Sequence, residues 1–232
     1  MVKVRVKRLL AVLCVLVLVG IAALWGLTRM TPHWYEPPNP TDEKVLELAD
    51  RVEFRLLEEF QKIRPDPEPW KLRVRENQLN AWLATKLQDW IAHKENLIWP
   101  EDLDMPQIRF EPDGISLAVA VESLGPSKII VTRMMPRFEG GELLVTVNRF
   151  SLGRLNIPGK PVERIAGLID EYASSAEIDD PVAFLFLRML RGDEHIDPVL
   201  NLADSRRVRL TNLELENGSI ILTAKTLAAI QP

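Results

Sequence analysis

A long apolar segment near the N-terminus is the first regular pattern in the chain. No charged residue occurs between Leu9 and Leu27, while Lys3, Arg5, Lys7 and Arg8 precede this segment. As a helix it would extend roughly 28 Å, close to the thickness of about 30 Å of a bilayer's hydrocarbon core. By the positive-inside rule, the pattern predicts a cytoplasmic basic tip and a transmembrane anchor in residues 1–30. The rest of the chain would then be extracytoplasmic, in a single-pass protein of the cell membrane.

Two other interpretations of this segment stay open. Gly20 and Ala22 are small residues at which a signal peptidase could cleave. The apolar run is longer than a usual signal core, which favours an uncleaved anchor. A lipoprotein signal is disfavoured, because Cys14 lies deep inside the run and follows Leu13 instead of a small residue.

Residues 31–40 contain four prolines, which fix φ and lack an amide donor, and so predict an extended spacer. Trp25, Trp34 and Tyr35 are placed to mark the membrane–water interface on the extracytoplasmic side. Residues 41–232 then form an extracytoplasmic α+β domain.

Helical periodicity begins at residue 41. Thr41 is the expected N-cap of a first helix, which must end before the proline-rich segment at residues 65–69. Its apolar stripe is Val45, Leu48, Ala49, Val52, Leu56, Phe60 and Ile63. A short strand at Trp70–Arg75 alternates apolar and basic residues, and a second helix is expected from about Asn77. Its apolar face is Leu79, Trp82, Leu83, Leu87, Trp90 and Ile91.

From Gln107 the apolar period changes to two, which is typical of strands with one buried face. Asp113-Gly114, Gly140-Gly141 and Asn217-Gly218 are turn sequences between such runs and predict antiparallel hairpins. Two more helices are expected between the second and third hairpins, one from Pro161 and one that begins at Asp180-Pro181, contains the wholly apolar stretch 182–187 and ends near Arg191-Gly192. The predicted architecture is one domain with a curved antiparallel sheet, a hairpin meander, packed with amphipathic helices.

The composition excludes several classes of function. Five of the 29 basic residues and none of the 33 acidic ones lie in residues 1–30, so the remainder carries a net charge of about −9. An acidic domain is a poor nucleic-acid binder. The single cysteine excludes an intramolecular disulfide and a cysteine-rich zinc site. We expect no cofactor and no bound metal.

Catalytic chemistry has one weak candidate. Acids flank His195 in the segment Asp193–Asp197, and such a group could bind a metal, although a solvated loop is the better interpretation. No phosphate loop, dinucleotide motif or nucleophile elbow is present in the sequence. A non-enzymatic protein is therefore expected, and a hydrolase with an unrecognised site is the weakest of the alternatives.

The alternating strands have an apolar side that either closes over a dry core or lines a groove for a lipid tail. The lining residues would be Leu117, Val119, Val121, Ile129, Val131, Leu143, Val145 and Val147. Phe184 and Phe186, in the apolar helix, would close the groove or dip into the bilayer. From the pattern alone the dry core is slightly favoured, because every strand needs an apolar face.

Two short motifs add a resemblance. The segment Glu76–Leu83, with its asparagines and leucines, and the segment Phe150–Pro158 after a long hairpin are similar to motifs of the YpmS-like family of single-pass envelope proteins. More loosely, residues 70–170 resemble tubular (TULIP-like) and LmeA-like lipid-binding domains. The resemblance implies a non-enzymatic lipid-binding fold, with membrane lipid as the partner.

The leading hypothesis is thus a membrane-anchored, non-enzymatic envelope protein that binds or passes lipid or another apolar ligand. The alternative is an interaction or scaffold module of an envelope protein assembly, in which the helix that contains the apolar stretch 182–187 contacts a partner protein.

Overall fold

The computed structural model of the chain describes residues 2–64, 68–92, 103–122, 128–157, 197–202 and 206–227. The helices in these ranges are α1 (Val2–Arg29), α2 (Glu43–Gln61), α3 (Glu76–Thr85) and α4 (Leu87–Ala92). The strands are β1 (Pro69–Arg75), β2 (Gln107–Glu111), β3 (Gly114–Ala120), β4 (Ile129–Glu139), β5 (Glu142–Leu152), β6 (Leu155–Asn156), β7 (Val199–Asn201), β8 (Arg207–Glu216) and β9 (Ser219–Leu227). The protein is α+β, as expected.

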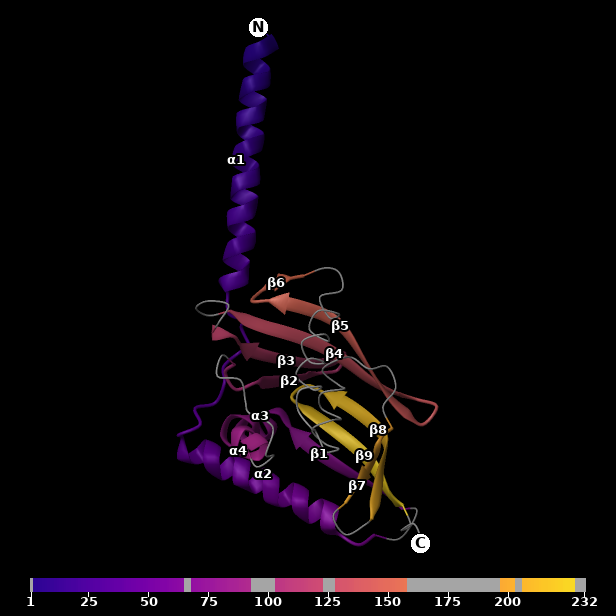
Figure 1. Cartoon of the computed structure of the whole chain (residues 1–232). Helices are drawn as coiled ribbons and strands as arrows, with labels where there is room; N and C mark the ends of the chain where they lie inside the picture. Colours follow the sequence, from indigo (N-terminus) through magenta and orange to yellow (C-terminus); the bar gives the residue numbers. More distant parts are fainter. Residues whose placement is uncertain are drawn as a thin grey trace.

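Helix α1 projects away from the rest of the molecule as a single rod (Figure 1). Its residues Val12–Arg29 are long and apolar enough to cross a membrane, and they are not buried within the protein. Near its C-terminus the Arg29 guanidinium lies 3.8 Å from the centre of the Trp25 ring, in a cation–π arrangement. A basic residue in the last turn also complements the helix dipole.

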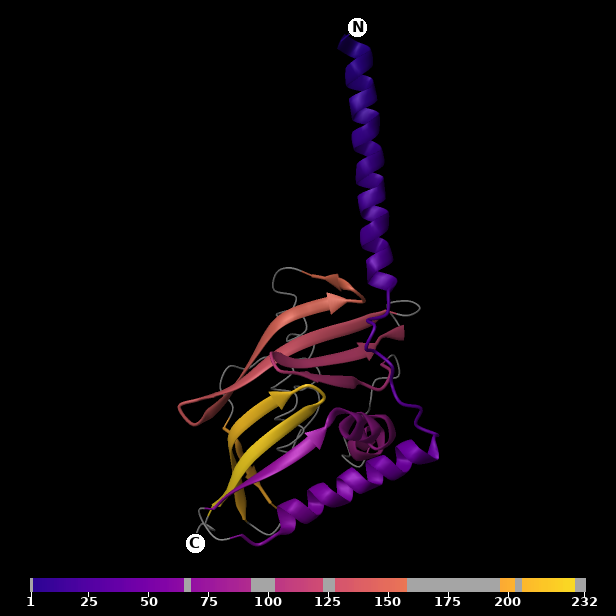
Figure 2. The same cartoon turned by 180° about the vertical axis from the view of Figure 1, so that it is seen from behind.

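The strands form two antiparallel sheets where the sequence pattern predicted one. We call β2-β3-β4-β5-β6 the proximal sheet, since it lies next to α1, and β1-β9-β8-β7 the distal sheet (Figures 1 and 2). The three predicted hairpins are present as β2–β3, β4–β5 and β8–β9. What the pattern could not show is that β1 pairs with β9, from the other end of the domain.

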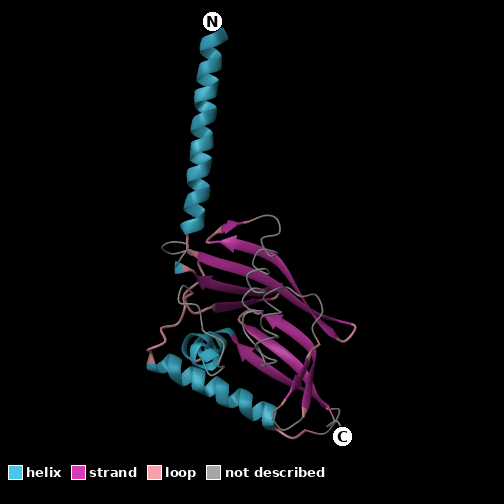
Figure 3. Ribbon diagram, in the orientation of Figure 1, coloured by secondary structure: helices cyan, strands magenta, loops and turns pink. Residues whose placement is uncertain are grey.

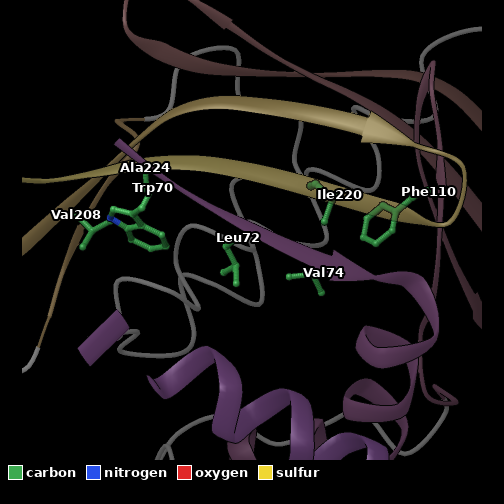
Figure 4. Close-up of a cluster of buried hydrophobic side chains, with 7 residues drawn as sticks. All are labelled: Trp70, Leu72, Val74, Phe110, Val208, Ile220 and Ala224. Carbon is green, nitrogen blue, oxygen red and sulfur yellow. The ribbon is translucent and has the colours of Figure 1, made fainter. Parts of the chain in front are cut away.

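The distal sheet buries one face against helices α2 and α3 (Figure 3). Its main cluster of buried side chains comes from both ends of the domain and from β2 of the proximal sheet (Figure 4), and consists of Trp70, Leu72, Val74, Phe110, Val208, Ile220 and Ala224. Leu56 and Phe60 of α2 pack against this cluster, with the Phe60 and Trp70 rings edge to face at 5.6 Å.

Both ends of α2 are capped by side chains. Asp42, not Thr41, is the N-cap, because its carboxylate accepts a hydrogen bond from the Lys44 amide at 2.9 Å. The Thr41 hydroxyl instead donates to the side chain of Asn39. At the other end the Arg206 guanidinium donates to the last carbonyls of the helix, including that of Lys62 at 3.1 Å. These caps fix α2 along the distal sheet.

Helix α3 pairs with the edge of the proximal sheet through polar side chains that the apolar pattern did not single out. The Asn80 side chain accepts from the Ile108 amide at 2.7 Å and donates to the Ile108 carbonyl at 2.8 Å. One turn earlier, the Glu76 carboxylate accepts from the Phe110 amide at 2.8 Å. Asn80 is buried, so it acts as a substitute strand partner and closes the β2 edge. The Asn-rich motif of the sequence therefore joins the two sheets.

Three predictions fall outside the described residues. They are the helix expected from Pro161, the apolar helix containing Phe184 and Phe186, and all of the Asp193–Asp197 cluster except Asp197.

Candidate functional site

The predicted lining residues lie on both faces of the proximal sheet. Directly opposed residues of neighbouring strands share a face, and Leu117 opposes Thr132 while Val119 opposes Ile130. Ile129 and Val131 therefore point to the other face, together with Ala118. The run Ile129-Ile130-Val131 is apolar throughout, so alternation alone could not show which of its residues face which side.

The face that carries Leu117 and Val119 is almost entirely apolar, and we call it the apolar face. Its opposed rows, from the α1 end outward, are Val119–Ile130–Leu152, Leu117–Thr132–Phe150, Ile115–Met134–Val147, Pro136–Val145 and Phe138–Leu143. Only Thr132 interrupts it. A bulge at Arg133/Met134 shifts the register, and it keeps Val147 on the same side as Phe150.

Burial along the apolar face is uneven. Leu143 and Val145 are almost fully buried in a cluster with Met134, at the end of the sheet far from α1. Leu117 and Val147 pack against that cluster, and Val119, near α1, is half-buried. The predicted lining residues of this face thus include several that contribute to an ordinary packed core.

The turn between β5 and β6 contacts the end of α1 directly. The Arg154 amide donates to the Leu27 carbonyl at 3.0 Å, and its side-chain Nε donates to the Thr31 carbonyl at 2.9 Å. Gly153 adopts φ +58°, and a Cβ atom there would lie 2.6–2.9 Å from the carbonyl oxygens of residues 27, 28 and 30. The turn therefore adds donors to one carbonyl in the last turn of α1, that of Leu27, and to one just beyond the helix, that of Thr31.

The spacer after α1 is packed onto the second face of the proximal sheet, which we call the spacer face. Tyr35 is buried against Ala118 and Ile129. The Gln107 side chain accepts from the Glu36 amide at 2.8 Å and donates to the Trp34 carbonyl at 3.2 Å. Tyr35 thus belongs to the domain and does not mark a lipid interface. Burial, with the nearby charge of Asp104, raises the pKa of the Tyr35 phenol, which stays neutral at physiological pH.

A pocket of about 320 Å³ opens on the spacer face beside the β5–β6 turn. Its polar lining consists of His33 from the spacer, Ser116, Arg133, Arg149 and Ser151 from the strands, and Arg154 from the turn. Val131, one of the predicted lining residues, also contributes. Among the residues that the structure describes, no acidic side chain lines this pocket.

The three arginines differ in how their charges are compensated. Arg133 forms ion pairs with Glu111 at 3.0 Å and with Asp113. Among the described residues, the Arg149 side chain has no ion-pair or hydrogen-bond partner, and it is exposed. Arg154 uses one of its guanidinium nitrogens on the Thr31 carbonyl. Free positive charge in the pocket is thus concentrated on Arg149 and Arg154.

A second pocket, of about 570 Å³, lies on the same face at the other side of the spacer. It includes Val121 and Ile129 of the predicted lining, together with Tyr35 and the charged residues Asp104, Glu122 and Lys128. Its charges are mixed, so it offers no clear preference for a ligand.

Sequence reasoning missed Arg149 and Arg154 because it weighed only apolar positions on these strands. A usable signal was present: Arg149 and Arg154 stand close together, without an intervening acid, in a domain whose net charge is negative. Their side-by-side placement with Arg133 depends on the strand register, which the sequence does not show.

For metal or hydrolytic chemistry, the described part of the chain holds no group of three or more metal-ligating His, Cys, Asp or Glu side chains. Asp197, from the acidic cluster of the sequence, lies 4.0 Å from the guanidinium of Arg209 on the distal sheet. No protein-family model matches the chain, and no curated protein matches it. Membership of the YpmS-like family stays a prediction.

Proposed function

We propose that the protein is a single-pass, membrane-anchored envelope protein whose domain binds or passes lipid, or another apolar ligand, without catalysing a reaction. The observation that supports this best is the apolar face of the proximal sheet, which begins beside the attachment point of α1. An 11-residue strand such as β4 extends roughly 36 Å. Acyl chains would lie on the half-buried end of this face next to α1, at Val119, Ile130 and Leu152, because the far end is filled by the packed cluster of Leu143 and Val145.

The contact between α1 and the domain supports the same proposal. A helix that spans the bilayer with a basic tip on the cytoplasmic side would place Gly153 and Arg154 near the opposite surface. Because the β5–β6 turn binds the helix end through its backbone, Val119, Ile130 and Leu152 would lie close to the lipid headgroups.

Site-specific photo-crosslinking in native membranes tests this function. A photoreactive amino acid at Val119 samples the apolar face, and the same amino acid at the exposed Thr146 is the matched control on the opposite face. We expect lipid adducts from position 119, identified by mass spectrometry of the full-length protein, and none from position 146. Absence of lipid adducts at 119 in a variant with wild-type circular dichroism would contradict lipid binding.

A scaffold role is the second candidate, and a feature of α2 favours it. Phe54 and Leu57 are 70% and 54% exposed, and Leu46 lies on the same side of the helix. Exposed apolar patches are often sites of protein association. A photoreactive residue at Phe54 should then give a protein adduct, whereas one at Lys44, exposed in the first turn of α2 and turned away from Leu46 and Leu57, should not. Equal labelling from both positions would contradict a scaffold surface on α2.

A further inference from the structure

We propose that the pocket beside the β5–β6 turn binds a phosphate group, as a phosphate monoester or diester. The inference rests on the proposed function for its placement at the membrane surface. Arg149 and Arg154 would supply charge-assisted hydrogen bonds, and the hydroxyls of Ser116 and Ser151 lie in the same lining. The pocket has a volume of about 320 Å³, at the small end of the range for ligand pockets, roughly 300–1,000 Å³.

The strand register gives the main argument. Arg133 and Arg149 are directly opposed on β4 and β5, and like charges in this position destabilise a sheet. Glu111 and Asp113 compensate Arg133, but no described acid compensates Arg149. A bound anion between Arg149 and Arg154 would remove this repulsion, and planar guanidinium groups suit phosphate oxygens.

The position of the pocket indicates where the phosphate would come from. Gly153, which lines the pocket, passes so close to the carbonyl oxygens at the end of α1 that no Cβ atom would fit between them. With α1 in a bilayer, the pocket would lie at the depth of the headgroups, where phosphodiesters are the most abundant anions. A soluble phosphate ester has the same chemistry, so the experiment must separate the two sources.

The test uses the full-length protein in an uncharged maltoside detergent. Phosphatidylglycerol retained by the protein is measured by native mass spectrometry, and binding of glycerol phosphate is measured by titration calorimetry. Arg149→Gln removes the uncompensated charge. Arg137→Gln is the matched control, since Arg137 is an exposed arginine of β4 at the far end of the sheet, paired with Glu139 at 3.1 Å.

We expect Arg149→Gln to weaken binding of the phosphate probe about tenfold, the effect of losing one charged hydrogen-bonding partner. Arg149→Lys should restore part of it, and Arg137→Gln should bind like the wild type. Retention of phosphatidylglycerol without binding of glycerol phosphate assigns the site to a lipid, and the reverse assigns it to a soluble ester. The proposal is overturned if neither probe binds, if Arg149→Gln binds normally, or if Arg137→Gln is equally weakened.

The same variants separate this proposal from the proposed function. If Arg149→Gln loses phosphate binding while no lipid adduct forms at position 119, the anion site stands and lipid binding on the apolar face fails. If lipid adducts at position 119 are unchanged in Arg149→Gln and phosphate binding is also unchanged, lipid binding stands and the anion site fails.

Discussion

The proximal and distal sheets resemble each other in architecture and differ in how they treat charge. On the outer face of the distal sheet, basic side chains of β1 meet acids of β8: Lys71 pairs with Glu214 at 3.5 Å, and Arg73 with Glu216 at 2.9 Å. On the spacer face of the proximal sheet, Arg149 has no such partner in the described part of the chain. Compensated charges suit a surface that only needs to be soluble, whereas an uncompensated one next to a pocket suits binding.

The two regions also differ in what holds them. The distal sheet is stabilised by one apolar cluster and two flanking helices. The proximal sheet is fixed at its margins by polar contacts, through Asn80 at the β2 edge and Gly153–Arg154 at the α1 end. The proximal region should therefore be sensitive to substitutions that leave its apolar packing intact.

The largest effect is expected at the junction of the two sheets. Asn80→Leu removes both hydrogen bonds to Ile108 and leaves its amide and carbonyl unsatisfied in a buried place. The free energy of unfolding should fall by about 3 kcal/mol. Thermal unfolding of the full-length protein in detergent, followed by circular dichroism, measures the change. Asn77→Leu, at an exposed position of the same helix, is the control and should unfold near the wild-type temperature.

A glycine pair tests the attachment of α1. Gly153 and Gly140 have similar φ angles, +58° and +61°, but a Cβ at Gly140 meets nothing within 4 Å. Alanine should cost about 1–2 kcal/mol of backbone strain at either position. Only Gly153→Ala should also separate the turn from the carbonyls of α1.

Spin-label distances report that separation. Cys14, the only cysteine, labels α1, and Thr146→Cys labels β5. The distance distribution in lipid nanodiscs should be narrow in the wild-type background and in Gly140→Ala, and broad in Gly153→Ala. Equal distributions for the two alanine variants would show that the turn does not hold α1.

Two smaller changes in the free energy of unfolding are expected, one in each sheet and opposite in sign. Arg149→Gln relieves repulsion from Arg133 and should raise the free energy of unfolding by about 0.5 kcal/mol. Arg73→Gln loses an exposed ion pair and should lower it by up to about 1 kcal/mol. Both differences should shrink in high salt. A loss of stability in Arg149→Gln would mean that Arg149 serves the fold and not a ligand.

The smallest effect is a pH dependence at the end of α2. The hydrogen bond from Lys62 lowers the pKa of Glu59 below its usual value of 4.5. A carboxyl with a lowered pKa in the folded state contributes stability above pH 4.5 and loses it as the pH falls through the folded value. At pH 7, Glu59→Gln should thus unfold at a slightly lower temperature than the wild type in a thermal unfolding experiment. This difference in unfolding temperature should disappear at acid pH. Lys62→Met should reduce the same dependence.

Local patterns predicted the local structure well. Alternation and turn residues located the three hairpins, and helical spacing located α2 and the start of α3. The N-cap moved by one residue, because Asn39 accepts a hydrogen bond from the Thr41 hydroxyl. These features depend on residues close in sequence.

Long-range features could not be predicted in the same way. The pairing of β1 with β9 joins segments about 150 residues apart in the chain, and the apolar run at Ile129–Val131 fits either face. The candidate site brings His33, Arg149 and Arg154 together through the register of β4 and β5 and through the packing of the spacer. Because the prolines at 31–40 indicated only an extended segment, neither the burial of Tyr35 nor the pocket that His33 lines could be inferred.

The central claim is that the proximal sheet lies at the membrane surface and the distal sheet away from it. In a Cys14→Ser background, single spin labels at Asn156 of β6 and at Asn212 of β8, both exposed, report this directly. In nanodiscs containing a gadolinium-chelating lipid headgroup, relaxation should be strongly enhanced at position 156 and nearly unchanged at position 212. Equal enhancement at the two positions, or greater enhancement at 212, would contradict the account.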